Sequence, residues 1–529
     1  MRKQILLFGT LGLTLASVTL TGCGKKGKSD TYDKDGNLII NLRNLYFSDY
    51  TGGGEYLKRL EKKFQVSLTF ENYQDENWQA QVTSQIKGGD LPDVFHSNVT
   101  NYNFVNTYKK WAKENVTKAL PEDLSKWPHL KHVLDNTTNI DALKVNGRLY
   151  GIPIAKNTSD FSIKFSQFTY LYRRDWAKKW GVYQENDEYT WSQFEALLDK
   201  FVQNLDVNKN QYALGDVEWG FPSITNFYKD VPHCYAYDSV QDKYVCNYTT
   251  DEYISGLMAS KEFSDKGRYY PSQNTLNTGD MRKEFIQGRI GVFYENISYA
   301  NYWAIREGIK DRFKGNITTE ELDDCTAIMK VRGPDGKYAI EGIDNWYSMT
   351  LFDKKISDTK LEKVLDILDW LLDEEGTKLA VYGIEGYDYL EDPVTHEIEL
   401  IPESWYDSNG NPIDKKNGAN YVRYLVTLGN DTLSINPSTD WHISNYLDDW
   451  EAEMKEAYAN NELRIFKERD EVMWLDTSLK SLYSETMRDG ANTAAMQYTY
   501  GAIDLDTFKA SFGYPWGDVL SEINSALGK

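Results

Sequence analysis

Residues 38–95, LIINLRNLYFSDYTGGGEYLKRLEKKFQVSLTFENYQDENWQAQVTSQIKGGDLPDVF, alternate strand patterns with a helical pattern. Residues 38–42 form an apolar run that predicts a strand, and apolar spacing over residues 55–64 predicts an amphipathic helix. Residues 66–70 alternate as a second strand, and residues 90–95 lead into a third. Alternating strands and helices predict an α/β sheet, with ligands bound at the carboxyl ends of its strands.

The rest of the chain continues this alternation and then becomes helical. Residues 191–201, 249–263 and 361–372 carry amphipathic helical spacing. From about residue 420 the pattern is mainly helical. The roughly 500 residues that follow the N-terminal segment are too many for a single hydrophobic core, so two or more lobes are expected.

The N-terminus has the layout of an export signal. Arg2 and Lys3 precede an apolar run over residues 5–20, and LTGC at residues 20–23 resembles the bacterial lipobox. We therefore expect a signal peptide over residues 1–22 and acylation (palmitate) at Cys23, which anchors the chain in the membrane. The alternative is an ordinary export signal with an incidental cysteine.

The polar residues after the cysteine favour a tether, which we place at residues 23–36. No later segment approaches the ~20 apolar residues that cross a bilayer. The expected location is the extracytoplasmic face of the cell membrane, at a Gram-positive cell surface.

The composition excludes one class of partner and favours another. A net charge of −21 argues against nucleic acid, whose phosphates require basic surfaces. The 15 Trp and 38 Tyr favour a carbohydrate ligand, because their rings offer an apolar face together with a polar group. The six histidines are scattered, and the loop at Asp206 has one carboxylate and no closing glutamate, so we expect no metal and no cofactor.

Three cysteines remain beyond Cys23, and two of them flank a predicted hairpin. Cys234 and Cys246 enclose a strand–turn–strand pattern whose turn lies near residues 239–242. Opposed cysteines on paired strands could form a disulfide in an oxidising compartment, and two free buried thiols are the alternative. Neither arrangement indicates catalysis.

Six segments, in order along the chain, resemble family 1 extracellular solute-binding proteins, most of all the large lipoproteins of the LipO and aldouronate-transport type. They are residues 89–94 (GDLPDV), 146–153 (NGRLYGIP), 172–176 (YRRDW) with 190–191 (TW), 285–292 (FIQGRIGV), 382–389 (YGIEGYDY) and 501–506 (GAIDLD). The second and fourth carry arginine where the family pattern has lysine.

The resemblance implies an α/β, two-lobed periplasmic-binding-protein-like class II fold with hinge crossovers and a helix-rich C-terminal part. It places lobe 1 at residues 37–153 and 330–400, and lobe 2 at residues 154–329 and 401–529. Crossovers are expected near residues 152–155 and 327–330. The implied function is capture of a carbohydrate, an oligosaccharide, for the permease subunits of an ABC transporter, by a monomer that is not an enzyme.

Loops that follow predicted strands and combine polar with aromatic residues are the candidate ligand contacts. Hydroxyl groups of a sugar bind best to carboxylates, amides and Arg, and the ring faces stack on aromatics. The candidates are Asp49, Tyr50, His96, Asn98, Trp219, Tyr294, Glu295, Asn296, Asn345 and Trp346. Trp219 and Trp346 stand beside Gly or Asn, a setting that favours a loop over a core.

Three alternatives stay open at this point. The same fold could serve as the ligand-sensing partner of a membrane receptor kinase. A secreted carbohydrate-active enzyme is a second alternative, although the chain carries none of the Gly-x-Ser-x-Gly, His-Glu-x-x-His or Walker motifs. The ligand could also be an acidic oligosaccharide bound by Arg43, Lys156 or Arg174, or a peptide.

Overall fold

The computed structural model describes most of the chain beyond the N-terminus. The described residues are 29–44, 54–72, 78–98, 104–156, 165–215, 222–270, 278–396, 398–401, 404, 418–427 and 441–529. The signal peptide, Cys23 and most of the tether therefore lie outside them. Within these ranges, no helix combines the length and the apolar character that a membrane crossing needs.

Lobe 1 is built on a five-stranded sheet. Its strands are β1 (Leu38–Asn44), β2 (Val66–Asn72), β3 (Val94–Asn98), β4 (Gly151–Ala155) and β13 (Trp346–Phe352), in the spatial order β2-β1-β3-β13-β4. Strand β1 pairs in parallel with β2 and β3, whereas β13 runs antiparallel to β3 and β4. The strand–helix alternation predicted from residues 38–95 is confirmed.

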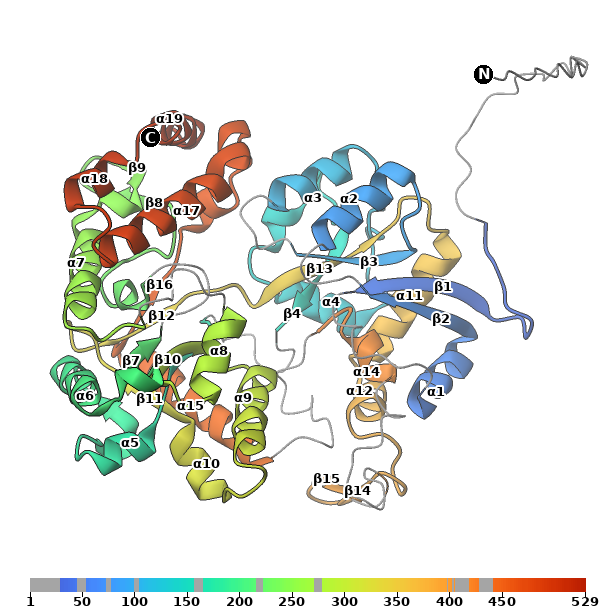
Figure 1. The fold of residues 1–529 in the computed structure, drawn as a ribbon. Coiled ribbons are helices and arrows are strands. Elements are labelled where there is room, and N and C mark those ends of the chain that lie inside the picture. Colours follow the sequence, from blue (N-terminus) through green and yellow to red (C-terminus); the bar gives the residue numbers. More distant parts are fainter. Residues whose placement is uncertain are drawn as a thin grey trace, which may run out of the picture.

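Helices cover both faces of this sheet (Figure 1). One face packs against α1 (Glu55–Phe64), α4 (Pro128–Asp135), α11 (Asp358–Trp370), α12 (Glu374–Val381) and α14 (Gly418–Arg423), and the other against α2 (Trp78–Gly88) and α3 (Phe104–Lys113). In helix α1, Tyr56, Leu57 and Leu60 lie on one stripe and are buried, as the apolar spacing of residues 55–64 predicted.

Lobe 2 is built on a second five-stranded sheet. Its strands are β5 (Phe168–Tyr172), β6 (Glu188–Tyr189), β7 (Tyr212–Gly215), β10 (Ile290–Asn296) and β11 (Ala327–Val331), in the order β6-β11-β5-β10-β7. Alternate residues of β5 face opposite cores, so Tyr170 and Tyr172 lie in one and Leu171 in the other.

The helices of lobe 2 divide between these two cores. One core takes α5 (Arg174–Lys179), α6 (Trp191–Asn204) and part of α7 (Asp251–Asp265), and the other takes α8 (Thr278–Ile286), α9 (Tyr299–Arg312), α10 (Thr319–Cys325) and α15 (Trp441–Ala459). Thr190 caps α6 with a reciprocal bond to Gln193, which explains the threonine at the start of this helix.

The C-terminal part is helical, as expected. Helices α16 (Asp470–Met473), α17 (Ser478–Thr499), α18 (Leu505–Ala510) and α19 (Trp516–Leu527) follow β16 (Leu463–Phe466), which pairs with β12 (Tyr338–Glu341). Helices α17 to α19 share a core with α7 and the hairpin β8 (Tyr235–Asp238) and β9 (Lys243–Cys246).

This hairpin decides the cysteine question left open by the sequence. Its register pairs Cys246 with Tyr235 rather than with Cys234. Cys234 and Cys246 are both free and buried, as is Cys325. Burial raises the pKa of all three thiols, so they remain protonated and unreactive at neutral pH.

The chain passes between the two sheets three times. It crosses between β4 and β5, between β12 and β13, and between α14 and α15. The crossover expected near residues 327–330 is wrong, because these residues form β11 inside the second sheet, and the chain crosses instead at residues 342–345. The last third also differs from expectation, since Ala419, Val422 and Val426 pack in the core of lobe 1.

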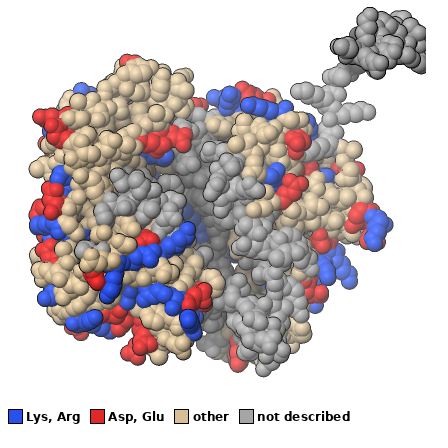
Figure 2. Space-filling view, viewed as in Figure 1, with Lys and Arg blue, Asp and Glu red and all other residues tan. Residues whose placement is uncertain are grey.

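The charged residues are distributed unevenly over the visible surface (Figure 2). Lys and Arg gather in a band across the lower half of lobe 2 in this view, while carboxylates are scattered over both lobes. The net charge of −21 is therefore not expressed as a single acidic face here.

Candidate ligand-binding cleft

The second crossing is held by hydrogen bonds to the loop that follows α4. The Asp344 carboxylate accepts from Thr138 Oγ1 and Asn139 Nδ2, both at 2.9 Å. It also lies 3.3 Å from Lys467 Nζ, on the segment that returns after β16. Asp344 thus ties the crossing to both lobes.

The candidate residues Asn345 and Trp346 are part of this structural network. Asn345 Oδ1 accepts from the Thr138 amide at 3.0 Å, and its Nδ2 donates to the Asn136 carbonyl at 2.7 Å. Trp346 is fully buried and donates a hydrogen bond from Nε1 to the Thr138 carbonyl at 2.9 Å. Its ring stacks on that of Trp474, with 5.5 Å between the ring centroids. The indole has no open face, so the reasoning that placed it on an exposed loop is wrong.

Trp346→Phe is therefore expected to affect stability rather than binding. The substitution leaves the buried Thr138 carbonyl without its indole donor, a loss of about 1–3 kcal/mol in the free energy of unfolding. Urea denaturation measures it, with Trp303→Phe at a 40% exposed site as the matched control. A loss of ligand affinity at unchanged stability would contradict the structural role.

His96 and Glu295 are also enclosed. His96 is fully buried in β3, and burial lowers its pKa to about 3, so the imidazole is neutral. Glu295 is fully buried in β10, and its carboxylate pairs with Arg282 Nε at 2.9 Å. Neither side chain offers a surface to a ligand in this arrangement.

Tyr294 and Asn296 stand at the end of β10 in lobe 2. Tyr294 is 7% exposed and accepts a hydrogen bond from Asn226 Nδ2 at 3.0 Å. Its ring stacks on that of Phe168, with 5.9 Å between the ring centroids, and its centroid lies 5.0 Å from that of Tyr170. Asn296 is half-buried and caps the following turn through the Ser298 amide. Among the candidates that the structure describes, only Asn296 is partly exposed.

The other candidates fall outside the described part of the chain. Asp49, Tyr50 and Trp219 are among the residues whose structure is not described, as is the side chain of Asn98. They stay predictions, as does acylation of Cys23.

Sequence reasoning named Lys156 only for an acidic ligand, and it missed Glu341 and His233, which lie with Lys156 at the junction between the lobes. Lys156 follows β4 in the first crossing, and its amide donates to the Asn345 carbonyl at 2.9 Å. Glu341 ends β12, directly before the second crossing, and His233 lies beside it, with 3.8 Å between Nε2 and the carboxylate. The only signal available in the sequence was the position of Lys156 directly after a predicted crossover strand.

The side chains of Lys156 and Glu341 are largely surrounded by protein but remain partly exposed to solvent. Lys156 is half-buried, and the Glu341 side chain is 29% exposed, yet protein surrounds both closely enough to shift their pKa values. Burial lowers the pKa of Lys156 to about 8, against the opposing effect of Asp344 and Glu341, and raises the pKa of Glu341. Both side chains therefore lie at the junction with part of their surface open to solvent.

The other two cations considered for an acidic ligand are already engaged. Arg174 forms a bidentate pair with Asp187 and contacts Asp324 at 3.3 Å. Arg43 donates to Gln81 Oε1 at 2.8 Å and lies 3.6 Å from Glu71. Of the three, only Lys156 lies in a crossing between the lobes.

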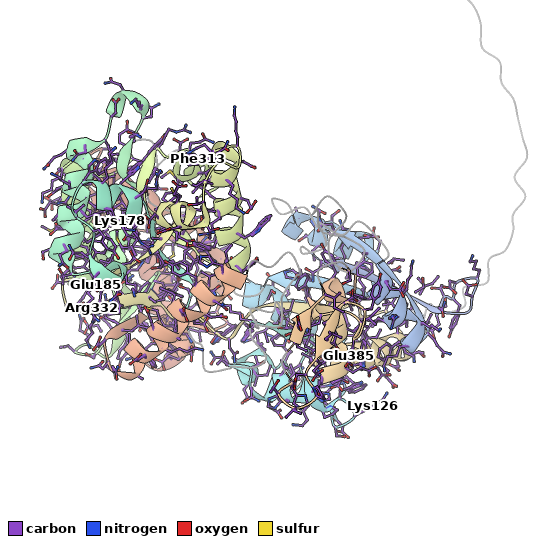
Figure 3. All side chains as sticks on the ribbon, turned by 90° about the horizontal axis from the view of Figure 1, so that it is seen from below. Lys126, Lys178, Glu185, Phe313, Arg332 and Glu385 are labelled. Carbon is purple, nitrogen blue, oxygen red and sulfur yellow. The ribbon has the colours of Figure 1, made fainter. Side chains whose placement is uncertain are left out.

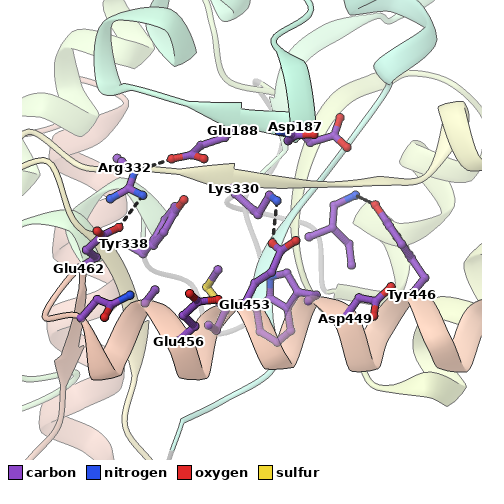
Figure 4. A pocket seen from close by; sticks show the side chains of 16 residues that line it. Asp187, Glu188, Lys330, Arg332, Tyr338, Tyr446, Asp449, Glu453, Glu456 and Glu462 are labelled. Atoms are coloured by element: carbon purple, nitrogen blue, oxygen red, sulfur yellow. Dashed lines mark hydrogen bonds and ion pairs between the residues drawn. The ribbon is translucent and has the colours of Figure 1, made fainter.

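A separate groove of about 550 Å³ lies within lobe 2, between α15 and the strands β6 and β11 (Figure 4). Its cations are neutralised, because Lys330 pairs with Glu453 at 2.6 Å and Arg332 pairs with Glu188 and Glu462 at 2.6 and 2.8 Å. Figure 3 shows Arg332 on the side of lobe 2 that faces away from lobe 1. The groove is therefore distinct from the junction between the lobes.

The Asp206 loop is held by local contacts of its single carboxylate. Asp206 accepts from the Asn208 amide at 3.0 Å and lies 3.4 Å from Lys209 Nζ. Across the described ranges, no group of three or more His, Cys, Asp or Glu side chains is arranged to hold a metal ion.

Two α/β lobes joined by three crossings, with polar side chains at the junction, define a two-domain solute-binding protein. The chain belongs to the bacterial extracellular solute-binding protein family, whose model matches residues 55–409. The resemblance predicted from the six segments is confirmed.

Relatives and solved structures agree with this membership. Lipoprotein LipO of Bacillus subtilis is 21% identical over 402 residues, covering 74% of this chain and 75% of the relative. The polygalacturonan/rhamnogalacturonan-binding protein YtcQ of the same organism is 20% identical over 402 residues, covering 73% and 74%.

Among solved structures, an extracellular solute-binding protein from Bifidobacterium longum subsp. infantis has a TM-score of 0.62 at 14% identity, covering 93% of this chain and 97% of its own. The S. pneumoniae ABC-transporter substrate-binding protein FusA, an EF-hand mutant in complex with fructo-nystose, has a TM-score of 0.61 at 16% identity, covering 92% and 98%. At these identities the structures establish the fold alone, and they confirm the two-lobed α/β prediction.

Proposed function

We propose that this protein captures a carbohydrate, an oligosaccharide, in the cleft between its lobes and delivers it to the permease subunits of an ABC transporter. The observation that carries the proposal is the set of solvent-accessible polar groups at the junction, led by Lys156 and Glu341, in a chain of this family. Relatives support the ligand class, since FusA is solved with fructo-nystose and YtcQ is named for pectic polysaccharides.

The proposal includes the location and the organisation of the chain. Cys23 carries the lipid anchor, and the tether holds the folded part at the extracytoplasmic face of the membrane as a monomer. Lobe 1 comprises residues 37–156 and 342–427, and lobe 2 residues 165–341 and 441–529, because their strands belong to the first and second sheets respectively. The protein binds its ligand without catalysis, in keeping with a family described as solute-binding proteins.

Ligand binding should close the cleft. The three crossings are the only described covalent links between the sheets, so rotation about them changes the separation of the lobes. A sugar that contacts both lobes stabilises the closed form by its differential affinity for it.

Carbohydrate binding is expected to raise the melting temperature of the full chain in mild detergent. A ligand at 100 times its dissociation constant adds ~2.7 kcal/mol to the free energy of unfolding. Differential scanning fluorimetry against mono- and oligosaccharides, uronates and peptides measures the shift. A shift with peptides alone, or with no compound in the panel, would refute the carbohydrate assignment.

A further inference from the structure

The first crossing between the lobes contains a cation, Lys156, without a counter-ion at contact distance. Within the described residues, Lys156 Nζ has no hydrogen-bond acceptor and no carboxylate within ion-pair distance, and Asp344 and Glu341 act on it only through longer-range electrostatics. An ammonium group that has lost part of its hydration without gaining a partner is costly. The arrangement therefore provides an open position for an acceptor.

The neighbouring cations do not share this property. Lys467 pairs with Asp344 at 3.3 Å and with Asp470 at 2.9 Å. Lys229 Nζ donates to the Pro232 carbonyl at 3.3 Å and lies over the Phe466 ring. Lys156 is thus the cation at the junction that is available to a ligand.

Glu341, one of the two carboxylates that act electrostatically on Lys156, supplies a hydrogen-bond acceptor. Glu341 forms no side-chain hydrogen bond with any described residue, and its contact with His233 is 3.8 Å long. Burial, with Lys229 and Arg488 adding to it, lowers the pKa of His233 well below its usual value, so this contact is not a charged pair at neutral pH. A carboxylate in this state accepts hydrogen bonds from hydroxyl groups.

Taken with the proposed function, on which this inference rests, we propose that the ligand is an acidic sugar. Lys156 binds its carboxylate, and Glu341 accepts from a hydroxyl group of the same ligand. A carboxylate fits Lys156 better than a neutral hydroxyl, because it adds the Coulomb attraction of a full negative charge to the hydrogen bond from the ammonium group. Lys156 is therefore the residue that determines specificity for the acid.

The test compares three trisaccharides by calorimetry on the full chain: a galacturonate trimer, its methyl ester and the neutral galactose trimer. The acid is expected to bind about 10- to 100-fold more tightly than the ester, the range of a hydrogen bond to a charged group. Lys156→Met should abolish this preference, and Lys156→Arg should retain most of it. Lys144→Met, at an exposed site on lobe 1, is the control and should leave it unchanged.

The pH dependence gives a second readout. Raising the pH from 7 to 9.5 neutralises Lys156, so the affinity for the acid should fall while that for the neutral trimer stays constant. Glu341 also faces this position and would add negative charge as it ionises; its contribution is the dependence that remains in Lys156→Met.

The outcomes separate the two proposals. Equal binding of acid and ester, or an acid preference that survives Lys156→Met, overturns the acidic-ligand inference and leaves carbohydrate capture intact. Binding of none of these trimers, nor of any sugar in the wider panel, overturns both.

Discussion

Lys360→Met is expected to lower the free energy of unfolding by about 3–5 kcal/mol, because it leaves a buried carboxylate without its counter-ion. Lys360 on α11 pairs with Asp93 at 2.9 Å, and both side chains are almost completely buried. The same Asp93 oxygen accepts from the Asn41 amide at 3.0 Å, which ties β1 to the segment before β3. The aspartate of the GDLPDV segment thus links helix and sheet.

Chemical denaturation of the variant measures this loss, and two further variants interpret it. Asp93→Asn combined with Lys360→Met removes both charges and should recover part of the stability. Lys131→Met breaks an exposed pair with Asp135 and should cost no more than ~1 kcal/mol. Equal losses in Lys360→Met and Lys131→Met would show that the buried pair has no special role.

Gly383→Ala is expected to destabilise lobe 1 by about 3 kcal/mol or more, through backbone strain together with a steric clash. Gly383 follows α12 with φ +90°, in the left-handed region. A Cβ there would overlap Tyr56 Oη and lie 2.5 Å from Asp388 Oδ2. Those two groups are hydrogen-bonded to each other at 2.5 Å in the interior, so neither can move freely.

Gly386→Ala is the matched control, because it isolates the backbone strain. Gly386 has φ +75° in the same turn, but no described atom lies within 4 Å of the position that an alanine Cβ would take. It should therefore cost only ~1–2 kcal/mol. Thermal and denaturant unfolding of both variants, with Gly383→Ala/Tyr56→Phe as a partial rescue, tests the clash. Equal losses at the two glycines would rule it out.

Sequence reasoning succeeded where the signal is local. Helices α6, α7 and α11 lie where apolar spacing predicted them. It failed for Trp346, whose neighbour Asn345 looked like a loop residue. That asparagine uses its amide to hold the crossing, and Trp474, 128 positions further along the chain, covers the indole.

The sequence by itself determined the class of elements and the family, because hydrophobic periodicity and ordered motifs are written in neighbouring residues. Only the tertiary structure decided where the chain crosses and which polar residues meet at the junction. Lys156, His233 and Glu341 are far apart in the chain, and each has an ordinary local context. Their shared burial arises from the packing of the two lobes. This burial lowers the pKa of Lys156 and raises the pKa of Glu341.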